Sequence, residues 1–313
     1  MTVDLAARLD GALRGALVAD ALGVPYEFGG PYAEESVVFG ARGTWSKPPG
    51  TWSDDGALWL ATLDSLLPPD GVGPARLDLE DHGRRYLAWM EKGAYTPDAE
   101  GLFDIGGATR SALSRIRSGL PAEEAGGRGE RDQGNGSLMR ILPVALVDLP
   151  AGEDRLLWAR RSSCVTHAHP VVQVTCAFSV AIAERLLAGV PRAEALAAGR
   201  AALDAHVGAD AELLAALAVL DGHTDRAGRG WVVDSFWSAW DAFAGADDVA
   251  HTIRRAVAYG NDTDTTAIIA GGLAGIHWGV DGIPAEWRAG MRGGAVVEPI
   301  LARLRAHRGV AGS

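Results

Sequence analysis

Leucines at helical spacing dominate the start of this chain and limit the kind of fold that it can form. The apolar stripe consists of Leu5, Leu9, Leu13 and Leu17. Small residues accompany the stripe at the same spacing, at Gly11, Gly15 and Ala19. Residues four apart lie on one face of an α-helix, and small side chains on that face let a second helix approach closely. Gly23 and Pro25 then end the predicted helix.

Similar periodicity continues along the chain, and alternating strand patterns are almost absent. The predicted helices span about 1–23, 53–67, 75–92, 107–118, 136–147, 170–188, 192–220, 231–244, 247–259, 263–279 and 284–307. The glycine-rich stretch 118–136 is predicted to be a loop within the domain, because helices flank it. The pattern predicts an all-α fold: a compact, orthogonal multi-helix bundle formed as a single domain over residues 1–313.

The composition is that of an ordinary globular protein, since 48% of the 313 residues are hydrophobic and 22% are charged. The net charge of −11, with no basic stripe to offset it, argues against a nucleic-acid backbone as a partner. Cys164 and Cys176 form no disulfide framework, and the first residues show no export signal. We therefore expect a cytoplasmic protein, and a monomer.

One uncharged stretch, 162–183, is long enough to suggest a transmembrane helix. It contains His167, His169 and Pro170, however, and aromatic anchors do not flank it. A buried core helix explains the stretch better, so we expect no membrane partner.

Acidic and hydroxyl side chains gather at two predicted helix starts. Ser53-Asp54-Asp55 opens one helix, and Asp262-Thr263-Asp264-Thr265 opens another. Helix capping is the simple explanation, because such side chains satisfy free backbone N–H groups at a helix start. Capping needs only one good side chain, however, and each cluster offers at least three oxygen ligands. The second cluster precedes a helix with glycines at 271, 275 and 279, a spacing typical of a close-packed interior helix.

The two clusters would form one site if the two helix starts converge. Four carboxylates would then meet in a partly buried place, where like charges need protons or cations between them. Oxygen ligands without His or Cys suit Mg²⁺ or Mn²⁺ better than Zn²⁺. Shared carboxylates could hold two ions about 3.5–4 Å apart, an arrangement that activates water.

Six motifs in this order resemble one family. They are GALVADALGVPYE at 15–27, WSDD at 52–55, FDIG at 103–106, GNGSLMR at 134–140, TH at 166–167 and GNDTDT at 260–265. The chain resembles the ADP-ribosylglycohydrolases, the group that contains dinitrogenase-reductase-activating glycohydrolase and the ADP-ribosyl-acceptor hydrolases. The resemblance implies a compact all-α fold and a binuclear Mg²⁺ or Mn²⁺ centre.

The resemblance also assigns site residues. The family's metal ligands correspond to Ser53, Asp54, Asp55, Asp262, Asp264 and Thr265, with Asp264 shared between the ions. Glu27 matches an acid near the metals, on a mobile segment whose loop 28–50 could act as a lid. Asp104 matches an acid implicated in catalysis, and His167 matches a histidine that contacts ribose or phosphate. The pyrophosphate and the adjoining ribose are expected at Asp132, Gln133, Gly134, Asn135 and Gly136.

Three positions depart from the family pattern. Gly56 stands where Thr or Ser is common and could loosen the first turn of its helix, and Gly260-Asn261 replaces Gly-Gly. Neither change removes an expected ligand. The pair Asp132-Gln133 is less typical still, which bears on the phosphate side of the site.

Structural explanations remain open for several of these residues. Asp104 could shape a turn, Glu27 could be a surface acid, and Asn135-Gly136 is a common turn pair whose N–H groups can also bind pyrophosphate. Asp20 is expected to be buried and hydrogen-bonded. Arginines 128, 131 and 140 could meet phosphate, although solvated arginines are the default. Cysteine 164 with histidines 167 and 169 supplies only three candidate zinc ligands, too few for a structural site.

The predicted reaction is metal-dependent hydrolysis of an ADP-ribosyl glycosidic bond through an oxocarbenium-like state. The metals would bind the ribose diol and polarise a water molecule, while Asp104 or Glu27 would handle protons. The products would be ADP-ribose and the acceptor, with protein arginine as the first choice and serine, a nucleic-acid end or a small molecule as the others. Two alternatives are a two-metal hydrolase of another nucleotide or phosphate ester, and a non-catalytic ADP-ribose-binding protein.

Overall fold

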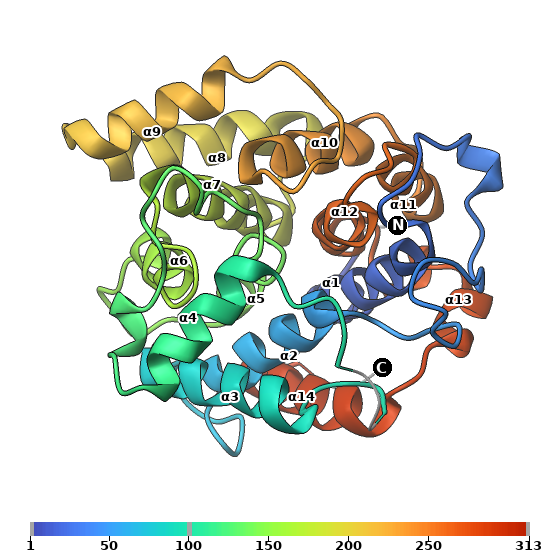
Figure 1. Cartoon of the computed structure of the whole chain (residues 1–313), viewed down its shortest axis with the longest axis horizontal. Helices are drawn as coiled ribbons and strands as arrows, with labels where there is room; N and C mark the ends of the chain where they lie inside the picture. Colours follow the sequence, from blue (N-terminus) through green and yellow to red (C-terminus); the bar gives the residue numbers. More distant parts are fainter. Residues whose placement is uncertain (1–2, 99–101, 311–313) are drawn as a thin grey trace.

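The computed structural model describes residues 3–98 and 102–310, and these residues form α-helices and short 3-10 helices without a β-strand. The α-helices are α1 Leu5–Gly23, α2 Asp54–Leu66, α3 Leu79–Lys92, α4 Gly107–Arg117, α5 Pro143–Leu146, α6 Arg155–Cys164, α7 Pro170–Leu187, α8 Arg192–Val207, α9 Ala211–Gly222, α10 Val232–Ala244, α11 Val249–Ala258, α12 Thr263–Trp278, α13 Ala285–Gly290 and α14 Gly294–His307. They run in several directions rather than as one parallel bundle (Figure 1). The prediction of an all-α fold is confirmed.

Helices α1 and α12 lie side by side at the centre of the fold (Figure 1). The glycines of α1 face those of α12, so that a Cβ atom added to Gly15 would stand 2.5 Å from the carbonyl oxygen of Gly271. Such a distance leaves no room for any side chain, so the backbones are in direct contact. The small-residue stripe of α1 therefore allows the close approach of a second helix, as its spacing predicts. Met1 and Thr2 of the predicted helix lie outside the described residues.

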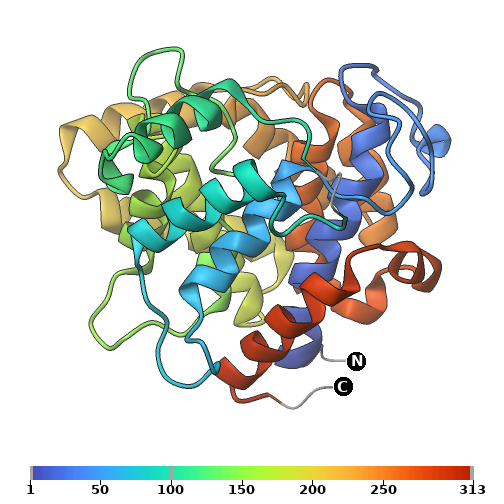
Figure 2. The ribbon, with the colours of Figure 1, turned by 60° about the horizontal axis from the view of Figure 1, so that its bottom comes forward.

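The last helix, α14, packs beside α1, so the two ends of the described chain lie near each other (Figure 2). Two ion pairs join these helices, Arg305 with Asp10 and Arg14 with Glu298. Asp10 is almost fully buried, which makes its arginine partner important for packing.

Several predicted helix boundaries are wrong, and glycine or capping chemistry explains most of the differences. The stretch predicted as one helix at 192–220 divides into α8 and α9, because Gly208 has a φ of +55° and Asp210 caps the second helix. A similar break at Gly293, with φ +72°, separates α13 from α14. Helix α6 was not predicted, although Asp154 caps it by accepting from the backbone N–H of Leu156.

The stretch predicted as a helix at 136–147 is mostly turns, with only Pro143–Leu146 helical. Its Arg140 is fully buried and donates to Tyr86 of α3 and to Thr166 of the turn before α7, which fixes these turns in place of a regular helix.

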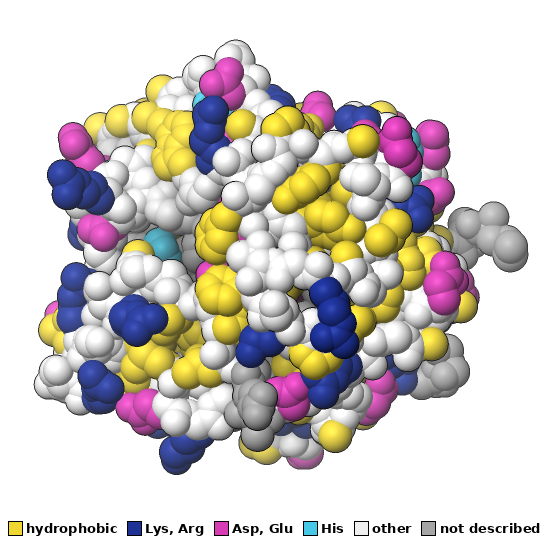
Figure 3. Space-filling view, turned by 45° about the vertical axis from the view of Figure 1, so that its right-hand side comes forward, with side chains coloured by type: hydrophobic (Ala, Val, Ile, Leu, Met, Phe, Trp, Pro, Cys, Tyr) yellow, Lys and Arg dark blue, Asp and Glu magenta, His cyan; other side chains and the backbone are white. Residues whose placement is uncertain are grey.

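Helix α7 is long and apolar enough, by length and composition alone, to cross a membrane. In the structure, 78% of that segment is buried against the rest of the protein. Burial of this extent is that of a core helix, as predicted from its histidines and proline. On the face shown in Figure 3, basic, acidic and apolar side chains are intermixed.

Candidate active site

The first turns of α2 and α12 bring the two acid clusters into one place. Their predicted metal ligands Ser53, Asp54, Asp55, Asp264 and Thr265 are all buried, and Asp262 is partly buried. Ser53 does cap α2, since its hydroxyl accepts from the N–H of Asp55 at 3.2 Å. Asp262 makes no such capping bond to α12. Capping therefore accounts for only part of the acidic character of these helix starts.

Two buried carboxylate oxygens of this cluster, Oδ2 of Asp55 and Oδ2 of Asp264, have no hydrogen-bond partner. Burial, reinforced by neighbouring carboxylates, raises the pKa of Asp54, Asp55 and Asp264 well above the usual range. An unpartnered buried carboxylate is costly unless a proton or a cation satisfies it. These residues thus fit a divalent cation with oxygen ligands.

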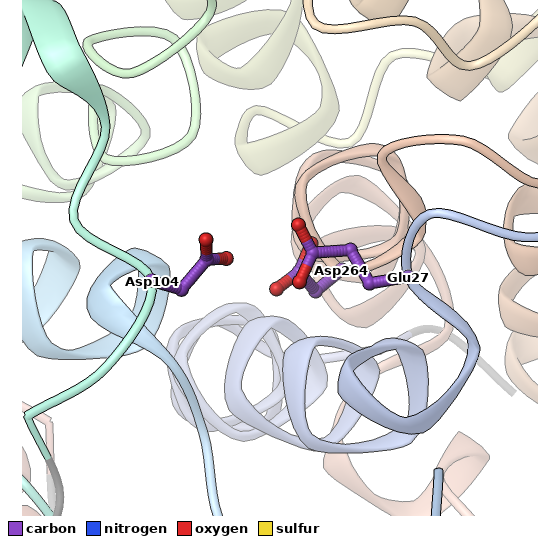
Figure 4. A group of neighbouring side chains, drawn as sticks. All are labelled: Glu27, Asp104 and Asp264. Atoms are coloured by element: carbon purple, nitrogen blue, oxygen red, sulfur yellow. The ribbon is translucent and has the colours of Figure 1, made fainter. Parts of the chain in front are cut away.

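Three acids from different parts of the chain converge beside this cluster (Figure 4). Glu27 follows the short 3-10 helix Val24–Tyr26 after α1, Asp104 precedes α4, and Asp264 lies in the first turn of α12. One oxygen of each lies within 4.8 Å of the others. Asp104 has a φ of +58°, a left-handed conformation that short polar residues tolerate better than most. The structure therefore places both predicted proton handlers at the acid cluster.

Glu27 and Asp104 differ in how strongly they hold a proton. Burial, followed by the charge of Asp104, raises the pKa of Glu27 to about 9, although the Trp45 indole N–H donates to its carboxylate. Burial raises the pKa of Asp104 to about 6. Two adjacent carboxyl groups with separated pKa values can serve as a proton donor and a proton acceptor.

Asp20 fixes the backbone at the start of α2 by hydrogen bonds. Its buried carboxylate accepts from the backbone N–H groups of Ser53, at 3.0 Å, and of Gly56, at 2.7 Å. The predicted role of Asp20 as a buried hydrogen-bonding group is confirmed. A Cβ atom on Gly56 would come within 2.8 Å of Leu17 and Trp52. This glycine is therefore closely packed, and its predicted effect on the first turn of the helix stays a prediction.

A pocket of about 330 Å³ opens over the acid cluster. It is lined by Glu27, Phe28, Asp54, Asp55, Asp104, Gly106, Gly107, Ala108, Thr109, Arg131, Gly134, Asn135, Gly136, Met139, His167, Asp262 and Thr265. Asn135 links the start of α12 to α10, because its Nδ2 donates to Asp262 at 2.8 Å and to Ser235 at 2.9 Å. The acid cluster and most of the predicted substrate-binding residues thus share one pocket.

Asp132 and Gln133 do not line this pocket. The Asp132 carboxylate accepts from the N–H of Gly129, and the Gln133 amide oxygen accepts from the indole of Trp231. Their contact with substrate stays a prediction.

The three arginines near this turn have different surroundings. Arg131 lines the pocket, whereas Arg128 forms an exposed ion pair with Glu212. Arg140 is fully buried, so the default expectation of a solvated arginine is wrong at this position. It bonds to neutral side chains of α3 and of the turn before α7.

Three pocket residues at the start of α4, Gly107, Ala108 and Thr109, were not predicted, nor was the exposed ring of Phe28 beside Glu27. A helix start rich in glycine directly after FDIG was a signal for the first group, because free N–H groups at such a start can face a ligand. No pattern marked Phe28.

A family model described as ADP-ribosylglycohydrolase matches residues 1–312. This chain belongs to the ADP-ribosylglycohydrolase family. It is 27% identical to ADP-ribosylarginine hydrolase Tri1 of Pseudomonas putida (strain GB-1), over 90% of this chain and 73% of that protein. It is also 27% identical to ADP-ribosyl-[dinitrogen reductase] glycohydrolase of Rhodospirillum rubrum, over 88% of this chain and 87% of that protein.

A solved structure, the ADP-ribosylglycohydrolase-related protein complex, has a similar fold with a TM-score of 0.75. It is 30% identical, and the match covers 97% of both chains. The family resemblance inferred from the six motifs is confirmed, and the protein is an enzyme of the glycohydrolase class.

Proposed function

We propose that this enzyme hydrolyses the bond between ADP-ribose and an arginine side chain of a modified protein, in a reaction that needs two Mg²⁺ or Mn²⁺ ions. The observation that carries the proposal is the pair of unpartnered, buried carboxylate oxygens on Asp55 and Asp264. Asp55 lines the pocket that Asn135 and His167 also line. Asp264 adjoins that pocket, because one of its carboxylate oxygens lies within 4.8 Å of oxygens of Glu27 and Asp104, which line it as well. Two relatives, an ADP-ribosylarginine hydrolase and an ADP-ribosyl-[dinitrogen reductase] glycohydrolase, support the choice of substrate by their names.

The residues that would hold the metals are Ser53, Asp54, Asp55, Asp262, Asp264 and Thr265. Divalent cations bound there would supply Lewis-acid chemistry, by binding ribose hydroxyls and making a water molecule more acidic. Asn135 helps to orient this set, because its amide holds one oxygen of Asp262.

Glu27 and Asp104 would move the protons. Cleavage at the ribose carbon leaves an electron-rich nitrogen that needs a proton, while the attacking water must lose one. The two carboxyl groups lie close to each other and to Asp264 on the pocket side of the cluster. Either can exchange a proton with the water or with the leaving group.

The part of the pocket lined by Gly134, Asn135, Gly136 and His167 would bind the nucleotide portion of the substrate. Backbone N–H groups of the turn at Gly134–Gly136 are suited to the pyrophosphate, and His167 to a phosphate or ribose oxygen. Asp132 and Gln133 would act on the same side. We further propose that the enzyme works as a cytoplasmic monomer.

The test is release of ADP-ribose from a panel of substrates carrying ADP-ribose on arginine, on serine or on a nucleic-acid end. We expect release from the arginine conjugate, complete loss with EDTA, and recovery with Mg²⁺ or Mn²⁺ but not with Zn²⁺. Full activity of the chelated enzyme would refute the metal requirement. Hydrolysis of other phosphate esters in place of every ADP-ribosyl conjugate would favour the alternative two-metal hydrolase.

A further inference from the structure

The guanidinium of Arg140 is fully buried. Among residues 3–98 and 102–310, its hydrogen-bond partners are all neutral: the side chains of Tyr86 and Thr166 and the backbone carbonyl of Ser162. Its Nη1 donates to the hydroxyl of Tyr86 at 2.7 Å, its Nη2 donates to the hydroxyl of Thr166 at 2.7 Å, and it also stacks over the Tyr86 ring. A buried charge without a counter-charge is unfavourable, so its position calls for an explanation.

The Thr166 hydroxyl links Arg140 to the His167 ring by hydrogen bonds. The Thr166 hydroxyl is fully buried and lies 2.8 Å from Nδ1 of His167. A guanidinium can only donate, so the Thr166 oxygen accepts from Arg140 and its own hydrogen needs another acceptor. Nδ1 of His167 is the acceptor within reach, and Thr166 therefore donates to it. Nδ1 must then carry no hydrogen, which leaves the ring hydrogen on Nε2.

The other edge of the His167 ring faces the pocket wall. A Cβ atom on Gly136 would lie 2.8 Å from Cε1 of His167, and one on Gly134 would lie 3.5 Å from its Nε2. Ser163 holds the His167 backbone from both sides, because its hydroxyl donates to the His167 carbonyl at 2.7 Å and its carbonyl accepts from the His167 N–H at 2.8 Å. The ring is thus fixed at both edges and in its backbone.

His167 is also uncharged. Burial, with a smaller contribution from Arg140, lowers the pKa of His167 to about 3. A neutral imidazole carries one N–H donor, and its tautomer decides which edge presents that donor.

We propose that Arg140 and Thr166 are positioning residues that lock His167 in its neutral Nε2–H tautomer, so that it presents a single hydrogen-bond donor to an oxygen atom of the ligand. The identity of that ligand, ADP-ribose, rests on the proposed function, whereas the tautomer does not. The relay explains why a guanidinium is buried among neutral groups: a carboxylate in place of Thr166 would accept a hydrogen from Nδ1 and select the opposite tautomer. His167 would then turn an acceptor toward the phosphate and ribose oxygens.

The tautomer can be read directly by long-range ¹H–¹⁵N correlation spectra of protein labelled on its eight histidines, with His167→Gln used to assign the signal. We expect the neutral Nε2–H pattern for His167 in the unmodified protein. Thr166→Val, which removes the hydroxyl but keeps the shape, and Arg140→Met, which frees the hydroxyl to accept, should both introduce the Nδ1–H form. Thr166→Ser should retain the original pattern.

Thr175→Val is the matched control, because Thr175 is equally buried and its hydroxyl bonds only within α7, to the carbonyl of Val171. In calorimetry with Mg²⁺ present, Thr166→Val should weaken ADP-ribose binding about tenfold, since the loss is that of one hydrogen bond to a charged or polar ligand oxygen. Thr166→Ser and Thr175→Val should bind within about twofold of the unmodified protein.

An Nδ1–H pattern in the unmodified protein would overturn the relay, and this measurement decides the question even if Thr166→Val fails to fold. An unchanged His167 pattern in folded Thr166→Val would overturn it as well. If the unmodified protein shows the Nε2–H pattern but does not bind ADP-ribose, the relay stands and the proposed function fails.

Discussion

Substitution of Gly23 by alanine should disturb the acid cluster without touching any acidic residue. Gly23 is the last residue of α1, and a Cβ atom there would stand 2.5 Å from Cα of Asp264 and 2.7 Å from the carbonyl oxygen of Thr263. Ordinary contacts begin at 3.4 Å, so the shortfall is 3.4 − 2.5 = 0.9 Å. The opposing atoms are backbone, which cannot rotate away. Helices α1 and α12 must therefore separate by about 1 Å at the site.

The expected size of the effect follows from two opposing contributions. Overpacking of a close interface costs about 1–3 kcal/mol, whereas alanine favours a helical conformation over glycine by up to about 1 kcal/mol. The backbone at Gly23 is helical, with φ −71° and ψ −40°, so the second contribution applies. We expect a net loss of about 1–2 kcal/mol in the free energy of unfolding. A displacement of about 1 Å at Asp264 should also lower turnover by about a hundredfold.

Gly222→Ala is the control, because Gly222 also ends a helix, α9, and a Cβ atom there would meet nothing within 4 Å. Its stability should change by less than about 1 kcal/mol and its turnover should not change. Urea unfolding gives the stability, and ADP-ribose release with Mg²⁺ present gives the turnover. The reasoning is refuted if Gly23→Ala matches Gly222→Ala in both measurements.

Two further predictions concern the acids themselves. Asp264→Asn should lose bound metal together with activity, whereas Asp104→Asn should keep its metal and ADP-ribose affinity and lose only turnover. Elemental analysis, combined with a hydrolysis assay, separates the two outcomes. If Asp264→Asn keeps its metal and its activity, the acid cluster is only a helix cap. Removal of metal should make stability depend on pH, because the folded protein raises the pKa of Glu27 from 4.5 to about 9 and that of Asp20 from 3.8 to about 7, mainly by burial. The folded state then binds protons that the unfolded state releases, so the melting temperature in EDTA should fall as pH rises from about 4 to about 9, and Mg²⁺ should reverse most of that fall; a melting temperature in EDTA that rises over this range would contradict the reasoning.

The local chemistry of helix starts could be read from the sequence. Ser53 and the acids after it stand at the beginning of α2, and Asp262 and Asp264 at the beginning of α12, as their capping character indicates. That the two starts meet was only a condition of the sequence argument, because helical spacing does not say which helix ends come together, and the structure shows that they do. The family resemblance added Glu27 and Asp104. From the sequence alone, Glu27 fits a surface acid better than a site residue, and Asp104 fits a turn residue as well as a catalytic one.

The surroundings of Arg140 could not be read in the same way. Its partners Tyr86 and Thr166 are 54 and 26 residues away, and both are neutral, so no charge pattern in the sequence indicates a buried guanidinium. The same contacts fix the turns at 137–142, where helical spacing had predicted a regular helix. Tertiary hydrogen bonds at this position outweigh local helix propensity, which is at most about 1 kcal/mol for most residues.

Glycines show most clearly why position in the fold decides what a residue does. Gly23 continues the four-residue spacing of Gly11 and Gly15 along α1, and the spacing alone indicates only that another helix comes close. In the structure this line of close contact with α12 ends at the acid cluster, where the Thr263 hydroxyl donates to the Gly23 carbonyl at 2.8 Å. The chain reaches Glu27 only four residues later, so the packing of α1 on α12 sets how far Glu27 lies from Asp264. The small-residue stripe of α1, which sets the packing of the two central helices, therefore also sets the relative positions of Glu27 and Asp264.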